Sequence, residues 1–168
     1  MIDIIDKKDC CGCHACEQVC TKRCIAMKLD SEGFHYPTIN KDTCIDCGLC
    51  EKVCPVLNVE PEVVNTEQEG HLLQLKDDEI RKHSTSGGAF TAISQWVIEH
   101  QGTVFGAKMC YDDLDHNVKK GWYVRHTGTN TIEGLEQFRV SKYVQSYVGN
   151  CYAQVKKLLK ADKWVLFS

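Results

Sequence analysis

A cysteine pattern that occurs twice in the first third of the chain restricts its fold more than any other feature. The first copy reads Cys10-Cys-Gly-Cys-His-Ala-Cys-Glu-Gln-Val-Cys20, and the second reads Cys44-Ile-Asp-Cys-Gly-Leu-Cys-Glu-Lys-Val-Cys54. The two copies share four cysteines, a glutamate and a valine at matching positions. Ten of the twelve cysteines lie between Cys10 and Cys54, and only Cys110 and Cys151 lie beyond them. Such clustering indicates a domain built around bound metal.

Disulfide bonds are one alternative use for so many cysteines. The N-terminal residues Met1-Ile-Asp-Ile-Ile-Asp-Lys-Lys lack the apolar core of a signal peptide, and no apolar run approaches the roughly 20 residues of a membrane helix. We therefore expect a cytoplasmic protein without a membrane segment, in which thiols stay reduced. Bonds between cysteines three residues apart would also strain disulfide geometry. The net charge of −3 gives no reason to expect nucleic acid as a partner.

The spacing of the second copy identifies the kind of metal site. It is Cys-x2-Cys-x2-Cys-x3-Cys followed by Pro55, which is the spacing of bacterial ferredoxins. In paired motifs of this kind, three thiolates bind one 4Fe-4S cluster and the fourth binds the cluster of the other motif. One cluster is then expected on Cys44, Cys47, Cys50 and Cys20. The other is expected on Cys10, Cys13, Cys16 and Cys54.

The first copy departs from this pattern in two respects. Thr21 stands where proline is usual, and Cys11 and Cys24 are supernumerary. Only the register that begins at Cys10 reproduces the spacing of the second copy. Cys11 and Cys24 are therefore interpreted as free structural thiols, with ligand substitution or a redox role as the alternatives. Cys110 and Cys151 are interpreted as isolated structural thiols.

A histidine ligand and a zinc ion are the alternatives to this interpretation. His14 replaces Gly48 of the second copy, and histidine can bind a cluster as in Rieske centres. Because the four-cysteine set is already complete, His14 is expected to be a solvated loop residue. Structural zinc is the alternative metal, but zinc ribbons pair two cysteine dyads across a longer gap. The spacing favours clusters, which exchange single electrons, over zinc, which does not.

The remaining sequence predicts an α+β protein with a two-cluster ferredoxin-like domain followed by a partial α/β domain. Between the motifs, 25–30 and 34–39 are expected to form a hairpin around a turn that contains Gly33. The acidic, turn-prone segment after Pro55 marks the boundary between domains at 1–60 and 71–168. In the second domain, Ala89, Ile93 and Val97 recur at helical spacing. The other expected elements are strands at 71–76, 103–109, 121–126 and 163–168 and a helix at 150–160.

Ser84-Thr-Ser-Gly-Gly88 precedes this expected helix and has two interpretations. Free N–H groups at the start of a helix attract anions, and glycine lets a ligand approach the backbone. The segment is therefore a candidate cradle for a phosphate or a flavin. Its residues are Ser84, Thr85, Ser86, Gly87 and Gly88. The alternative is an ordinary helix cap followed by small residues.

Three segments of the second domain support a family resemblance. Residues 81–90, 104–107 and 139–146 resemble the beta subunit family of coenzyme F-420 hydrogenases and dehydrogenases. Members of that family bind FAD and move electrons between clusters, flavin and a deazaflavin or another acceptor. The resemblance implies flavin contacts by the cradle and also by Lys142, Tyr143 and Gln145, for which a surface-exposed connecting segment is the alternative interpretation. Because a larger half follows this region in the family, we expect this chain to be part of a longer protein and to bind FAD weakly or not at all by itself.

The sequence therefore predicts an iron–sulfur electron-transfer protein that is part of a flavin-dependent oxidoreductase. Its expected cofactors are two 4Fe-4S clusters and FAD, and its expected partner is a redox protein or a flavin or deazaflavin cofactor. The alternative is a ferredoxin-like carrier or docking module without catalysis of its own.

Overall fold

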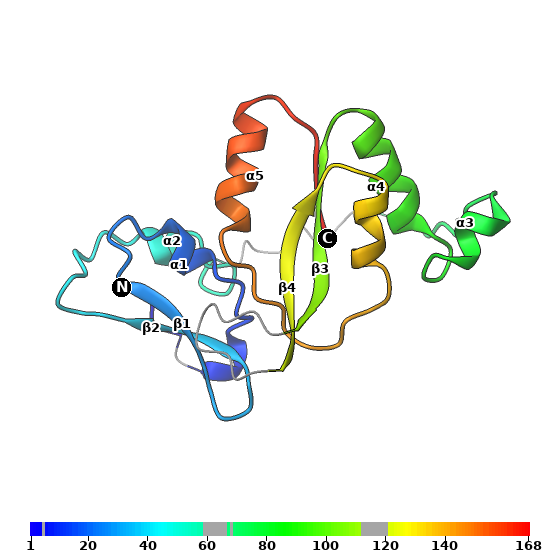
Figure 1. Cartoon of the computed structure of the whole chain (residues 1–168). Helices are drawn as coiled ribbons and strands as arrows, with labels where there is room; N and C mark the ends of the chain where they lie inside the picture. Colours follow the sequence, from blue (N-terminus) through cyan, green and yellow to red (C-terminus); the bar gives the residue numbers. More distant parts are fainter. Residues whose placement is uncertain (5, 59–66, 68, 112–120) are drawn as a thin grey trace. The chain divides into compact units, whose positions relative to one another are not determined.

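The computed structural model describes residues 1–4, 6–58, 67, 69–111 and 121–168. The chain divides into two compact units, Met1–Gln68 and Glu69–Ser168 (Figure 1). Most of the acidic segment in which the sequence places the domain boundary lies outside the described residues.

The first unit contains the hairpin expected between the two cysteine motifs. Strands β1 (Ile25–Leu29) and β2 (His35–Ile39) pair in antiparallel register, which confirms this prediction. In the turn, Asp30 Oδ1 accepts hydrogen bonds from the N–H groups of Glu32 and Phe34, each at 2.9 Å. Lys7 Nζ lies 2.6 Å from Asp30 Oδ2. The lysine, together with these N–H groups, lowers the pKa of Asp30 to about 2, so the turn keeps its charge at neutral pH.

The third cysteine of each motif lies in a short helix. These helices are α1 (Ala15–Val19) and α2 (Leu49–Lys52), while a 3₁₀ helix, η1 (Lys7–Asp9), precedes the first motif. Four of the six buried core residues of the unit are cysteines, and three of these four belong to the motifs. The six residues are Ile2, Cys16, Cys24, Ile25, Cys50 and Cys54. A core of this kind leaves little apolar packing that is independent of the thiols.

The second unit is built on a mixed three-stranded sheet. Its strands are β3 (Thr103–Tyr111), β4 (Trp122–Thr129) and β5 (Val165–Phe167), in the order β4-β3-β5. The central strand β3 pairs antiparallel with β4 and parallel with β5. The strands predicted at 103–109, 121–126 and 163–168 are thereby confirmed.

The two faces of this sheet are covered by different helices (Figure 1). Val104 is fully buried against α4 (Ala89–Glu99) and the 3₁₀ helix η2 (Glu133–Phe138). Its neighbour Phe105, 1% exposed, packs instead against α5 (Cys151–Lys160), because successive strand residues point to opposite faces. Both long helices agree with the predicted ones. No helix in the described part of the chain is long and apolar enough to cross a membrane.

The predicted strand at 71–76 is wrong. This segment is described but belongs to no sheet, and Leu72 and Leu73 are exposed. The N–H of Leu75 donates to the carbonyl of Gly87 at 2.9 Å, and the chain then enters the short helix α3 (Asp78–Lys82). The apolar residues alone did not distinguish a strand from an extended segment that has no neighbouring strand.

The buried face of α4 differs from the predicted one. Val97 is buried as expected, but Ala89 and Ile93 are exposed. Thr91 and Ser94 are buried in their place. A buried hydroxyl requires a hydrogen-bond partner, and Thr91 has Ser84 and the distant Arg139 as partners, which the helical period of apolar residues does not reveal.

Candidate metal centres and the cavity of the second unit

Two cavities in the first unit gather its cysteines into two groups of five. One is lined by Cys20, Cys24, Cys44, Cys47 and Cys50. The other is lined by Cys10, Cys11, Cys13, Cys16 and Cys54. The fold therefore places Cys20 with the second motif and Cys54 with the first. Each cavity contains the four thiols that the crossed ferredoxin pattern assigns to one cluster, plus one supernumerary thiol.

The loops that carry these cysteines share a backbone conformation. Gly12 and His14 of the first motif have φ of 60° and 64°. The equivalent residues of the second motif, Asp46 and Gly48, have φ of 51° and 72°. The sequence repeat is thus also a conformational repeat, with a left-handed residue before and after the second cysteine of each motif. Alternating turns of this type direct backbone N–H groups into a concave anion site, as in many iron–sulfur proteins.

In the cavity of the first motif, Cys16 and Cys54 are buried and Cys10 and Cys13 are half-buried, whereas Cys11 is exposed. Burial raises the pKa of the Cys16 thiol to about 12 and also raises the pKa values of Cys10 and Cys13. Iron binds the thiolate, so each of these cysteines must lose its proton when it becomes a ligand. Binding is therefore stronger as the pH rises.

Cys24 lies inside the cavity of the second motif, although its sequence position gives it no place in the ferredoxin spacing. Its Sγ is 3.3 Å from Cys20 Sγ, and its N–H donates to the same sulfur at 3.4 Å. Although burial opposes ionisation, these hydrogen bonds lower the pKa of Cys20. The contact with Cys20 and burial raise the pKa of Cys24 to about 11.

The prediction that His14 is a solvated loop residue is wrong. The side chain is fully buried, and its Nδ1 lies 2.8 Å from Glu17 Oε2. The other carboxylate oxygen of Glu17 accepts the N–H of Met27 at 3.1 Å, which joins α1 to β1. The ring of His35 lies 5.2 Å from that of His14. Glu17 and the hairpin thus hold a histidine at a backbone position that favours glycine.

The donors of both cavities suit iron–sulfur clusters. All twelve cysteines are free thiols, so none is used in a disulfide bond. Over the described residues, no three His, Cys, Asp or Glu side chains converge closely enough to hold a single metal ion. A zinc site needs four ligands about 2.0–2.3 Å from one ion. Each cavity brings together the four thiols that the ferredoxin spacing assigns to one 4Fe-4S cluster.

The second unit contains a cavity of about 430 Å³, which lies within the range of small-molecule sites. Its lining comes from the start of α4, the sheet and the segment after η2. Of the predicted cradle, Thr85 and Gly88 line it, whereas Ser84, Ser86 and Gly87 are absent from its described lining. Lys142 lines it, whereas Tyr143 and Gln145 do not belong to that lining.

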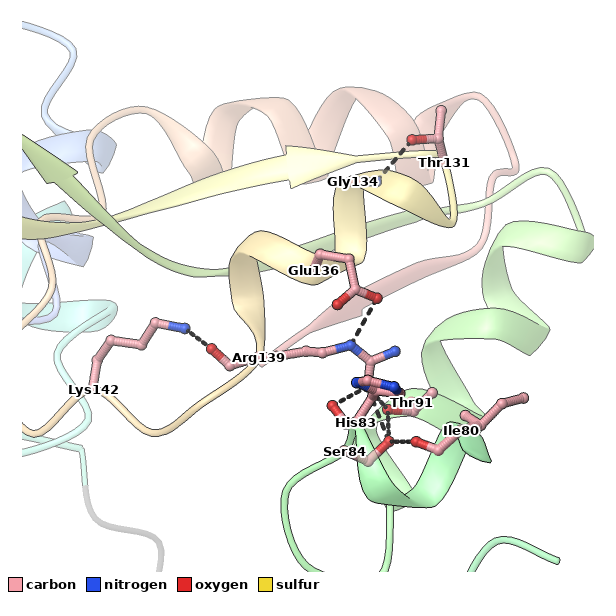
Figure 2. A network of polar contacts seen from close by, with 9 residues as sticks. All are labelled: Ile80, His83, Ser84, Thr91, Thr131, Gly134, Glu136, Arg139 and Lys142. Carbon is pink, nitrogen blue, oxygen red and sulfur yellow. Dashed lines mark hydrogen bonds and ion pairs between the residues drawn. The ribbon is translucent and has the colours of Figure 1, made fainter. Parts of the chain in front are cut away.

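An arginine that the sequence did not single out organises one wall of this cavity (Figure 2). Arg139 Nη1 donates to Thr91 Oγ1 at 2.7 Å, to Ser84 Oγ at 2.9 Å and to the His83 carbonyl at 3.2 Å. Its Nε donates to Glu136 Oε1 at 2.9 Å. Ser84 is therefore a structural link between α3 and α4. Because Thr91 and Arg139 are far apart in the chain, only the fold brings this network together.

The electrostatic character of the cavity is cationic. Lys142 Nζ donates to the Arg139 carbonyl at 2.5 Å, and burial lowers the pKa of this lysine. The lining includes no aspartate or glutamate among the described residues. Gly88, with φ of 82°, begins α4 at the cavity wall, where helix N–H groups favour anions. On the sheet side, His126 Nδ1 lies 2.7 Å from Ser146 Oγ. This arrangement suits a ligand with an anionic part.

Comparison with known proteins concerns the first unit. The family model of the 4Fe-4S dicluster domain matches residues 9–58. That span includes both cysteine motifs and the thiols of both cavities. A search of curated proteins found no match to the chain. The match identifies a 4Fe-4S dicluster domain at residues 9–58, which supports a role in iron–sulfur electron transfer.

Proposed function

We propose that this protein relays single electrons through two 4Fe-4S clusters with crossed ligands. Cys10, Cys13, Cys16 and Cys54 bind one cluster. Cys20, Cys44, Cys47 and Cys50 bind the other. The observation that carries this proposal is the exchange of Cys20 and Cys54 between the motifs, because a crossed fourth ligand distinguishes two-cluster ferredoxins from proteins with independent metal sites.

The clusters supply reversible one-electron chemistry, and the chain determines where that chemistry takes place. The buried thiols fix the cluster positions, and the core residues Ile2 and Ile25 exclude water from their surroundings. Exclusion of water and N–H groups directed at the sulfurs are the features by which a protein sets the reduction potential of a cluster. In the first motif, the backbone N–H groups of Gly12 and Ala15 donate hydrogen bonds to the Cys10 and Cys13 thiols.

We further propose that the cavity of the second unit binds the phosphate-bearing part of a flavin. Arg139, Lys142 and the start of α4 provide positive charge, and the space is open to a ligand of this size. The resemblance of residues 81–90 and 139–146 to the F-420 hydrogenase and dehydrogenase beta subunits supports FAD as that flavin. The protein is then a component of a flavin-dependent oxidoreductase. The competing function is a carrier whose second unit only docks partners.

A reductive titration after incubation with FAD and gel filtration separates these two functions. Clusters alone take up about two electrons per chain, because each cubane accepts one. A retained flavin adds about two more. Because the cavity offers Arg139, Lys142 and the start of α4 to the phosphates, we expect retention in place of the weak binding that the family resemblance implies, with about four electrons and an absorbance spectrum that includes flavin. An uptake of two electrons with all FAD in the low-molecular-weight fraction contradicts flavin binding and leaves the cluster proposal intact.

A pair of lysine variants tests the location of the flavin. Lys142→Met removes a cation from the cavity lining and is expected to weaken FAD binding about tenfold, the effect of losing one charge-assisted phosphate contact. Lys157→Met makes the same change at an exposed position of α5 outside that lining and is expected to leave binding unchanged. Equal affinities in the two variants, measured by fluorescence titration, contradict this location.

A further inference from the structure

The supernumerary thiol of the second motif's cavity is buried where a cluster ligand would be. Cys24 is only 7% exposed and lines the same cavity as Cys44, Cys47 and Cys50. Its Sγ lies 3.3 Å from that of Cys20. Its thiol also interacts with the side chain of Cys44. Cys24 thus contacts two of the four expected ligands of one cluster, which distinguishes it from a structural thiol elsewhere in the core.

We propose that Cys24 is an alternative ligand of the cluster bound by Cys44, Cys47 and Cys50, able to replace Cys20. The inference rests on the proposed two-cluster function and adds a fifth ligand to one of its sites. Both sulfurs line one cavity and are in van der Waals contact with each other. A small movement of the Cys24 side chain therefore brings its sulfur to the position that the Cys20 sulfur occupies.

The local fold holds both thiols at the cavity. The Arg23 N–H donates to the Cys20 carbonyl at 3.1 Å, and Arg23 has φ of 50°, which turns the chain back on itself between the two cysteines. The carbonyl of Cys24 accepts the Asn40 N–H at 2.7 Å, which ties Cys24 to the end of the hairpin. This turn keeps the second thiol beside the first without placing strain on β1.

Cys11 provides a comparison within the same unit. It also lines a cluster cavity and is also supernumerary, but it is exposed and directly follows the expected ligand Cys10. Cys24 is buried and separated from Cys20 by a turn that brings the sulfurs together. The geometry therefore assigns the role of alternative ligand to Cys24.

Ligand exchange at this site changes no oxidation state. The Cys24 thiol releases its proton and forms an iron–sulfur bond, while the Cys20 sulfur leaves the same iron and takes up a proton. No external oxidant or reductant is needed. The exchange gives the cluster a means of surviving the loss or chemical modification of Cys20.

Iron and sulfide analysis of three anaerobically purified variants tests this proposal. Cys20→Ala is expected to retain about eight irons per chain, as two cubanes require, with the resonance of one cluster shifted in electron paramagnetic resonance spectra. Cys20→Ala combined with Cys24→Val is expected to retain about four. Cys24→Val alone should keep about eight, because the original four ligands remain. Valine is apolar and close to cysteine in volume, which suits the buried position.

Two results overturn the proposal: loss of about half the iron in Cys20→Ala, or equal iron in Cys20→Ala and the double variant. Circular dichroism checks that the double variant is folded, and Cys24→Ser replaces Cys24→Val if it is not. If the wild type holds eight irons while Cys20→Ala holds four, only the alternative ligand is refuted. A wild type without iron refutes the two-cluster function as well.

Discussion

Replacement of Cys54 by alanine is expected to remove the cluster bound by Cys10, Cys13 and Cys16 and to leave the other cluster in place. Cys54 belongs to the second motif in sequence, but its buried thiol lines the cavity of the first. Iron content should fall to about half, from roughly eight to four per chain. The variant is best made together with Cys11→Ser, so that the other thiol of this cavity cannot substitute.

Cys50→Ala, made together with Cys24→Val so that the fifth thiol of its cavity cannot substitute, is the matched control for this prediction. Cys50 belongs to the same motif and is also buried, but its thiol lines the cavity of Cys44 and Cys47. The two variants should therefore lose different clusters, which electron paramagnetic resonance spectra of the reduced proteins distinguish. Loss of the same cluster in both variants contradicts the crossed arrangement and favours motifs that each bind one cluster with their own four cysteines.

Replacement of Arg139 by alanine is expected to destabilise the second unit by roughly 1.5–3 kcal/mol, the contribution typical of hydrogen bonds to a charged donor. The side chain is 12% exposed and joins Ser84 and Thr91 to the end of η2. The loss stays within this range because the Ser84 and Thr91 hydroxyls still bond to one another at 2.8 Å. Glu136 is exposed, so its ion pair with Arg139 adds little.

Tryptophan fluorescence measures this effect on the second unit alone, because Trp96, Trp122 and Trp164 all lie within it. Arg139→Ala should lower the denaturant midpoint, and Arg139→Lys should give an intermediate value because lysine keeps the charge but not the fork of donors. Glu136→Gln, which disturbs only the exposed side of the network, serves as the control. Equal midpoints for Arg139→Ala and Glu136→Gln would show that the buried hydrogen bonds contribute nothing measurable.

Features of the first unit could be predicted from the sequence because they depend on neighbours in the chain. The hairpin of β1 and β2 follows from two strand-like segments around Asp30 and Gly33. The grouping of the thiols follows from a repeat whose spacing has a known geometry. The burial of His14 does not follow, because it depends on the carboxylate of Glu17 and on the hairpin packed beside it.

The second unit shows the same division between local and long-range effects. Strand β3 and helix α5 were predictable from their apolar patterns, whereas residues 71–76 have a strand-like pattern but no partner strand in the described structure. The cradle segment contributes Thr85 and Gly88 to the cavity, but Arg139 comes from a distant part of the chain. Polar networks of this kind have no period in the sequence and become visible only in the fold.

The central claim is that the first unit binds two 4Fe-4S clusters, and metal and sulfide analysis of the anaerobically purified protein tests it most directly. Two cubanes on eight thiolates predict about eight irons and eight acid-labile sulfides per chain, with a brown colour that is bleached by reduction. Two zinc ions per chain without sulfide would contradict the account, because zinc carries no electrons and needs only four donors for each ion.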